Sequence, residues 1–366
     1  MDLVLQRVNI NLLSGRTTSE DLFDSKGTLL LKKGIQLTES IWKYITNREV
    51  YVLQYHEDYA GSKKVNKFRK DTYIELVGSI WSIYHEARII EPEHIEKTVK
   101  LVQVILNELQ SPNIYLDLNE SRVSFEELKQ HDSWTFVHVV NVAILTALTG
   151  IKLGYNGKRL ENLTLGALLH DLGKVKIPSE ILNKPGSLTD EEYRVIKQHP
   201  TLGWELLEGN RTLTNVQAII TQHHERWNGE GYPRGLRKNE INIDAQIVAV
   251  ADVYEALTAD RPYRKGLPPY HALEMIIAWS GHDFNPAMVK AFRKSLILYP
   301  DNAVVTLNTG ETGLISAVPT QMPTRPLVRL LFDKNRRYLN KELYIDLMQD
   351  LTRFIERVEF MEAIEE

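Results

Sequence analysis

Two pairs of adjacent side chains stand out for the chemistry that they could perform. His170 is followed directly by Asp171, and His223 is followed directly by His224 at the end of an apolar helical face. Neighbouring residues of a helix point about 100° apart, so both side chains of a pair can contact the same target only if that target is wide. Two metal ions roughly 3.5–4 Å apart would provide such a target. The pairs therefore predict a metal-dependent hydrolase.

Two further histidines lie where they could complete such a site. His138 opens an apolar helical run, and the apolar residues at i+4 and i+7 share its face, so its imidazole should point inwards. A single histidine of this kind is more often a hydrogen-bonded core residue than a metal ligand. His199 stands directly before Pro200, which is expected to end a helix that starts at the capping box of residues 189–192. A ligand and a solvent-facing histidine fit that position equally well.

Two acids lie in apolar helical sequence as well. Asp171 ends one apolar run and Asp252 is embedded in another, and a buried carboxylate without a partner costs several kcal/mol. Each acid should therefore be paired with a cation. For Asp171 the alternative to a dinuclear metal centre is an ion pair at the helix end with Lys174 or Lys176. Gly173 is expected to stop the helix there through its backbone freedom.

Composition limits the kind of protein and the kind of metal. The 44 basic and 48 acidic residues give a net charge of −4, which argues against a binder of nucleic acid polymers. Cysteine is absent, so the available metal ligands are imidazole and carboxylate, which suit iron, manganese and zinc. Because the sequence shows no signal core and no uninterrupted apolar stretch of about 18 residues, we expect a soluble cytoplasmic protein without a membrane partner. The oligomeric state stays open, with a homodimer as one option.

The apolar pattern predicts a mainly α protein with four regions. Residues 1–56 are expected to form a small β-rich region, and residues 57–115 connecting helices. Residues 116–299 should form the helical bundle that carries the candidate site. Residues 300–366 are expected to form a small β-rich region with a final helix.

The expected elements at the two ends follow from turn signals and from spacing. Strands are expected at residues 8–10, 28–31, 50–53, 304–307, 312–315 and 327–331. Apolar residues recur at helical spacing from Asp71 and again from Pro92, which predicts two helices. The final helix is expected from Leu347 to Val358.

A resemblance to a known family sharpens this interpretation. Residues 133–286, somewhat under half of the chain, resemble the HD-GYP family, the bacterial cyclic-di-GMP phosphodiesterases within the HD metallohydrolase superfamily. The resemblance rests on an ordered series of motifs, which are His-Asp-Leu-Gly-Lys at 170–174 with Ile-Pro at 177–178 and Lys-Pro-Gly at 184–186, His-His-Glu at 223–225 with Gly-Glu-Gly-Tyr-Pro-Arg-Gly-Leu at 229–236, and Ala-Asp-Val-Tyr-Glu-Ala-Leu-Thr at 251–258 with Arg-Pro-Tyr-Arg at 261–264. A lone His-Asp pair is a weak signal, whereas this ordered series is specific.

The resemblance implies seven metal ligands, with Asp171 bridging two divalent ions. The ligands are His138, His170, Asp171, His199, His223, His224 and Asp252, which are the residues that the apolar patterns also favour. Some family members hold a third ion through a glutamate at the position that Trp134 occupies here, so we expect two ions. Iron or manganese is favoured, and zinc is an option.

The resemblance also implies substrate contacts. Lys174 lies one turn after the ligand pair and is expected to hold the scissile phosphate, so Lys174 and Asp171 are the expected catalytic residues. Arg261 and Arg264 can present two guanidinium groups together, and Tyr232 can hydrogen-bond a phosphate or stack on a guanine. The ordinary alternatives are surface ion pairs for the arginines and loop packing for the tyrosine.

Phosphodiester hydrolysis is the chemistry that follows. Two cations lower the pKa of a bridging water and offset charge on a phosphate oxygen during in-line attack. The resemblance thus implies hydrolysis of cyclic-di-GMP to linear pGpG, with further cleavage to GMP as an option, which would lower a bacterial second messenger. The alternatives are a cyclic-dinucleotide-binding signalling protein without turnover and the same chemistry on another cyclic dinucleotide. The intact set of candidate ligands favours the enzyme.

Overall fold

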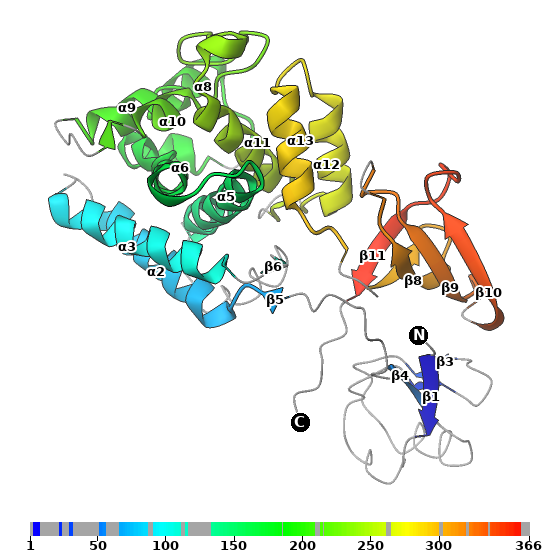
Figure 1. Cartoon of the computed structure of the whole chain (residues 1–366). Helices are drawn as coiled ribbons and strands as arrows, with labels where there is room; N and C mark the ends of the chain where they lie inside the picture. Colours follow the sequence, from blue (N-terminus) through cyan, green and yellow to red (C-terminus); the bar gives the residue numbers. More distant parts are fainter. Residues whose placement is uncertain are drawn as a thin grey trace. The chain divides into compact units, whose positions relative to one another are not determined.

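The structure is a computed structural model in which the chain forms two compact units. One unit is Val65–Leu298, and the other joins Met1–Lys64 with Tyr299–Glu366. The residues that the structure describes are 3–7, 22–23, 29–31, 51–55, 66–86, 91–110, 114–115, 133–184, 186–208, 213–214, 216–260, 265–299, 303–319, 322–335 and 337–359. The mainly α fold with small β-rich ends is as predicted (Figure 1).

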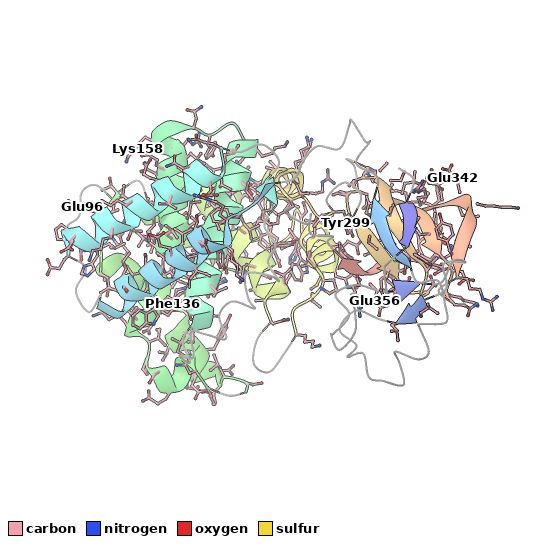
Figure 2. The ribbon with its side chains drawn as sticks, turned by 90° about the horizontal axis from the view of Figure 1, so that it is seen from below. Glu96, Phe136, Lys158, Tyr299, Glu342 and Glu356 are labelled. Carbon is pink, nitrogen blue, oxygen red and sulfur yellow. The ribbon has the colours of Figure 1, made fainter. Side chains whose placement is uncertain are left out.

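The first two helices of the larger unit confirm the predicted helical spacing. They are α2 (Lys70–Glu86) and α3 (Pro92–Glu108), and Pro92 begins the second one. The apolar face of α2 is fully buried, with Leu76 exposed by 1% and Ile80 by 0%. The helix α2 packs on α5 (Ser133–Lys152), and α3 packs on α6 (Gly157–Leu169) (Figure 2). These helices, predicted as connectors, are therefore part of the same compact unit as the helical bundle.

The helix α5 is the core helix of this unit. It packs against α2, α6, α11 (Ile243–Thr258) and α13 (Pro286–Ser295). By length and composition its segment Thr135–Lys152 could cross a membrane, but 72% of that segment is buried inside the protein. Burial against neighbouring helices explains its apolar composition.

Short helices and turns connect these elements. They are η3 (Leu172–Lys176), α7 (Ser179–Leu182), α8 (Asp190–Ile196), α9 (His199–Glu205), α10 (Gln217–Gln222), η5 (Lys238–Glu240) and α12 (Pro269–Ala278). The predicted capping box starts α8, because the backbone N–H of Glu192 donates to Thr189 Oγ1 and the backbone N–H of Thr189 donates to the Glu192 carboxylate. The strands β5 (Asn66–Lys67) and β6 (Ile114–Tyr115) form a parallel pair.

The prediction that Pro200 ends a helix at His199 is wrong. The helix α8 ends at Ile196, and His199 is the first residue of α9. Proline is tolerated in the first turn of a helix because the N–H that it lacks would have no partner there. Pro200 therefore begins a helix instead of ending one, and His199 is held at that start.

The C-terminal sheet has five antiparallel strands in the order β10-β9-β8-β7-β11. Three of them confirm the predicted strands, namely β7 (Val304–Leu307), β8 (Thr312–Ala317) and β9 (Leu327–Phe332). The strand β10 (Tyr338–Asp346) follows them and was not predicted.

The predicted final helix from Leu347 to Val358 is wrong. Turns follow Asp346, and the strand β11 (Ile355–Glu359) pairs with β7. Apolar residues in this segment recur at helical spacing, but Leu351 is 71% exposed while Ile355 is 1% exposed, so they do not share one buried face. Asp350 favours the turn, because its carboxylate accepts hydrogen bonds from the backbone N–H and the hydroxyl of Thr352.

The N-terminal sheet has the strand order β1-β4-β2-β3. Its strands are β1 (Leu3–Arg7), β2 (Leu22–Phe23), β3 (Leu29–Leu31) and β4 (Tyr51–Tyr55). Two of the predicted strands, near residues 28–31 and 50–53, are thereby confirmed. The predicted strand at residues 8–10 lies outside the described residues.

Candidate metal centre

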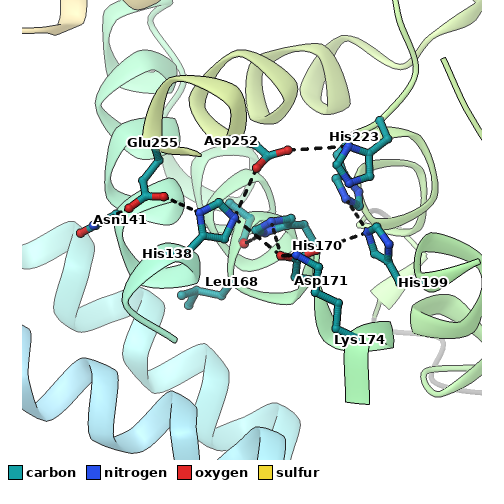
Figure 3. A network of polar contacts seen from close by, with 12 residues as sticks. His138, Asn141, Leu168, His170, Asp171, Lys174, His199, His223, Asp252 and Glu255 are labelled. Atoms are coloured by element: carbon teal, nitrogen blue, oxygen red, sulfur yellow. Dashed lines mark hydrogen bonds and ion pairs between the residues drawn. The ribbon is translucent and has the colours of Figure 1, made fainter. Parts of the chain in front are cut away.

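The structure brings all seven candidate ligands together inside the larger unit. Their positions are His138 on α5, His170 at the C-cap of α6, Asp171 between α6 and η3, His199 at the start of α9, His223 and His224 directly after α10, and Asp252 on α11. Five of the seven are buried, while the His138 and His224 side chains are 14% and 18% exposed. Residues from five separate helices thus converge on one buried point (Figure 3).

Asp171 belongs to two groups that could each hold a metal ion. One group combines Asp171 with His138 and His170, and the other combines it with His199, His223 and His224. Within each group the candidate ligand atoms lie within 4.8 Å of one another. Asp171 is therefore the geometric link between the two groups.

The two oxygens of Asp171 face different histidines. Oδ2 lies 3.3 Å from His170 Nε2 and 3.6 Å from His138 Nε2, whereas Oδ1 lies 3.3 Å from His199 Nε2. Asp252 has a similar arrangement, with Oδ1 3.3 Å from His138 Nε2 and Oδ2 3.7 Å from His224 Nδ1. Both carboxylates thus span the two groups.

Four of the imidazoles are oriented through Nδ1, so that Nε2 faces the centre. The Nδ1 atoms of three of them lie 2.7–2.9 Å from the backbone carbonyl three residues earlier, and these three are His170, His199 and His223. His138 Nδ1 instead lies 2.5 Å from the Glu255 carboxylate. An acceptor at Nδ1 fixes the tautomer that carries a lone pair on Nε2, which is the usual arrangement around metal-binding histidines.

The donor atoms fit a metal better than they fit one another. His199 Nε2 and His223 Nε2 are 3.2 Å apart, and both carry lone pairs when the Nδ1 atoms hold the protons. Two buried atoms, His170 Nε2 and Asp171 Oδ1, have no hydrogen-bond partner among the described residues. Buried polar atoms normally have partners, and a cation between these groups would provide one.

The protonation states agree with a ligand role. Burial lowers the pKa of His199 to about 4 and that of His224 to about 3, and burial also lowers the pKa of His223 well below its usual range. These imidazoles are neutral at pH 7 and present lone pairs. Burial alone would raise the pKa of Asp171, but the charge of Lys174 and then the contacts of His170 lower it well below its usual range.

His138 differs from the other histidines. Burial by itself would lower its pKa, but the charge of Glu255 and the hydrogen bond to Asp252 raise it to about 10. In the protein without metal this imidazole is therefore charged at neutral pH. A metal at Nε2 would have to displace a proton there.

The predicted substrate residues have different outcomes. Lys174 Nζ lies 2.5 Å from Asp171 Oδ2, so the ion pair that was the alternative interpretation of Asp171 is present within the candidate metal centre. The Tyr232 ring stacks on His224 at 4.7 Å between centroids, and burial raises the pKa of its phenol. Tyr232 therefore lies at the centre, where Lys197 Nζ is 5.5 Å from its ring. Arg261 and Arg264 lie outside the described residues.

The loop that carries Tyr232 is held by a buried acid that sequence reasoning missed. Glu225 is 2% exposed, and its carboxylate accepts the backbone N–H groups of Arg234 and Leu236. Gly231 passes so close to the backbone of Glu225 that a side chain would overlap with it. Glu225 stands within the His-His-Glu motif, so its buried position could have been inferred from the two histidines before it.

Glu255 was also missed, although the same reasoning applied to it as to Asp252. It lies one turn further along α11 and is 1% exposed. Its carboxylate lies against His138 Nδ1 and accepts a hydrogen bond from Asn141 Nδ2 at 3.0 Å. An acid in apolar helical sequence again had a buried cationic partner.

Gly173 serves a different purpose from the predicted one. A Cβ at this position would overlap with the carbonyl oxygen of His199 and the backbone nitrogen of Gly203. Glycine is therefore required for close approach of η3 to α9, and not to stop α6 by an unusual backbone conformation. This contact fixes Asp171 relative to His199.

Comparisons with known proteins identify related families and proteins. The HD domain family model matches residues 122–288, and the model described as a KOW domain associated with HD domain matches residues 304–366. The chain is 33% identical over 273 residues to the cyclic di-GMP phosphodiesterase PA4108 of Pseudomonas aeruginosa, covering 74% of this chain and 64% of that protein.

Two further relatives match shorter stretches of the chain. One is a cyclic di-GMP phosphodiesterase of Thermotoga maritima, 41% identical over 165 residues that cover 44% of this chain and 45% of the relative. The other is the 3'3'-cGAMP-specific phosphodiesterase 1 of Vibrio cholerae, 42% identical over 137 residues that cover 36% of this chain and 30% of the relative. The matched part is thus less than two thirds of each relative.

Proposed function

Because the HD domain family model matches residues 122–288, we propose that this protein is a metal-dependent phosphodiesterase that hydrolyses cyclic-di-GMP. The observation that carries the proposal is the position of Asp171, which is shared by two groups of candidate metal ligands in a buried site. A single metal ion would not require two groups joined by one carboxylate. The names of two relatives support cyclic-di-GMP as the substrate.

In this proposal two divalent ions would be bound, and Asp171 would be a ligand that they share. The first ion would be held by His138, His170 and Asp171, and the second by Asp171, His199, His223 and His224. Asp252 directs one oxygen towards each group and completes the ligand set. Imidazole and carboxylate donors suit iron and manganese, and zinc is an alternative that the metal content would reveal.

The side chains of the centre perform separate tasks in hydrolysis. When bound, the ions supply a nucleophile from water at neutral pH and offset negative charge on the phosphate. Lys174 is 24% exposed and contacts Asp171, so its ammonium can hold a phosphate oxygen beside the ions. Tyr232 remains protonated and can donate a hydrogen bond to the substrate from the loop that Glu225 holds. Arg261 and Arg264 are proposed to anchor the second phosphate.

Linear pGpG is the proposed first product, and product analysis decides whether cleavage continues to GMP. A second candidate substrate is 3'3'-cGAMP, which the name of the Vibrio cholerae relative favours. Binding of a cyclic dinucleotide without turnover is the less favoured alternative, because the structure brings all seven ligands together.

A cytoplasmic location is part of the proposal. It is supported by the burial of α5, which contains the one candidate membrane-spanning segment among the described residues. A homodimer stays an untested prediction.

The proposal can be tested by product analysis. Protein purified without oxygen is loaded separately with Fe²⁺ or Mn²⁺ and given cyclic-di-GMP or 3'3'-cGAMP, with Asp171→Ala as the control. We expect linear pGpG from the parent and none from the variant. Faster cleavage of 3'3'-cGAMP would favour the second candidate, and tight binding without product under every metal would refute the enzyme.

A further inference from the structure

We propose that a relay of three buried side chains, Tyr73, Asn141 and Glu255, positions His138 for metal binding. The relay begins on α2, which precedes the residues that match the HD domain family. Tyr73 is thereby assigned as a positioning residue of the metal centre. This inference rests on the proposed metal centre, but it does not depend on which cyclic dinucleotide is the substrate.

The relay is a continuous series of short hydrogen bonds. Tyr73 Oη donates to Asn141 Oδ1 at 2.6 Å, and Asn141 Nδ2 donates to Glu255 Oε1 at 3.0 Å. The other oxygen of Glu255, Oε2, lies 2.5 Å from His138 Nδ1. Figure 3 shows Glu255 between Asn141 and His138. The relay crosses from α2 through α5 to α11 and returns to α5.

Burial makes the order of donors and acceptors unambiguous. Tyr73 is 3% exposed, Asn141 0% and Glu255 1%, so no side chain of the relay is open to bulk water. A carboxylate only accepts hydrogen bonds, so Asn141 must turn its NH₂ group towards Glu255. Its oxygen then faces α2 and requires a donor, which the Tyr73 hydroxyl supplies. Each member thus fixes the orientation of the next.

His138 needs this support more than the other oriented histidines do. The imidazoles of His170, His199 and His223 lie against backbone carbonyls of α6, α8 and α10, so the helix backbones set the positions of these acceptors. The partner of His138 is a side chain with several rotatable bonds. Asn141 donates to its second oxygen, and Tyr73 in turn donates to Asn141, so both residues contribute to its position.

The expected effect is a selective loss of metal affinity. Replacing a direct partner of a metal-binding histidine typically costs about 10–100-fold in affinity. Tyr73 acts two steps further away, so we expect Tyr73→Phe to weaken metal binding by about three- to tenfold, which is below the range for a direct partner. Asn141→Ser interrupts the relay one step nearer to His138 and should weaken metal binding more.

A matched control is available on the same helix. Tyr84 is 4% exposed, and its hydroxyl donates to the backbone oxygen of Leu168 at 2.8 Å. Tyr84→Phe therefore removes a buried hydroxyl of α2 without touching the relay. The two variants should lose similar thermal stability as metal-free proteins, and only Tyr73→Phe should lose metal affinity.

The experiment is a titration of the full-length metal-free proteins with Mn²⁺ against a competing chelator, together with absorption spectra of the Co²⁺-loaded proteins. Weaker binding and an altered Co²⁺ spectrum in Tyr73→Phe but not in Tyr84→Phe would support the relay. Equal effects in both variants, or none in either, would overturn it. A parent protein that binds no metal would instead refute the proposed metal centre itself.

Discussion

Metal loading at pH 8 should displace about one proton from His138 in each chain. The charge of Glu255 and the hydrogen bond to Asp252 outweigh burial and hold the pKa of this imidazole at about 10, so it is protonated in the metal-free protein. A metal at Nε2 requires the lone pair that the proton occupies. His199 and His224, with pKa values of about 4 and about 3, have no proton to lose at this pH.

The size of the effect follows from the pKa of His138. At pH 8 the solution lies two pH units below a pKa of about 10, so removing the proton costs about 3 kcal/mol of metal-binding free energy. The affinity for the metal ion that binds at His138 should rise about tenfold per pH unit between about pH 6 and pH 9. Since the folded pKa lies above 6.5, the charged imidazole stabilises the metal-free fold below about pH 6.5. This contribution is lost as the pH rises through about 10.

Calorimetry can count the proton directly. Mn²⁺ is titrated into the metal-free protein at pH 8 in buffers with different ionisation enthalpies, and the dependence of the heat on the buffer gives the number of protons released. Glu255→Gln removes the largest cause that raises the pKa of His138, so its count should be lower than that of the parent. Any proton lost by bound water is common to both proteins. Equal counts in parent and variant would refute this explanation of the electrostatics.

Three other substitutions test separate parts of the site. Gly173→Ala forces a Cβ against the backbone of His199, so it should cost about 1–3 kcal/mol of stability and reduce bound metal. In the control Gly78→Ala the added Cβ meets no atom within 4 Å, so stability and bound metal should be unchanged. Thermal unfolding and metal analysis measure the two quantities in both variants. Glu225→Gln weakens the acceptor that holds the Tyr232 loop, so steady-state kinetics should show a higher KM with metal content unchanged; a loss of metal would contradict this role. Arg261→Ala should also weaken substrate binding and leave the metal in place, and metal analysis of the variant would show whether its role is misassigned.

The ligands could be predicted because each one breaks a local pattern. A histidine or an acid on an apolar helical face is visible within a window of a few residues, as for Asp252 and for His223. The same rule identifies Glu255, which lies within the motif at residues 251–258 but was not predicted as a site residue. The ordered motifs then indicated which of these residues would meet, although they lie up to 114 positions apart along the chain.

Other features depend on contacts that no local pattern contains. The role of Gly173 follows from the approach of a helix start 26 residues later in the chain, and the link from Tyr73 to Asn141 spans 68 residues. In the C-terminal tail a local pattern predicts the wrong element. Its apolar residues recur at helical spacing, but pairing with β7 determines that residues 355–359 form a strand.

The most direct test of the central claim is the number of metal ions bound by variants of the two groups. If Asp171 joins two ions, the parent should hold about two per chain, His224→Ala about one, and Asp171→Asn close to none, because Asp171 is a candidate ligand in both groups whereas His224 is a candidate ligand in one. Elemental analysis of the three proteins after identical metal loading gives these numbers. An Asp171→Asn protein that retains as much metal as His224→Ala would contradict a shared carboxylate at the centre of the site.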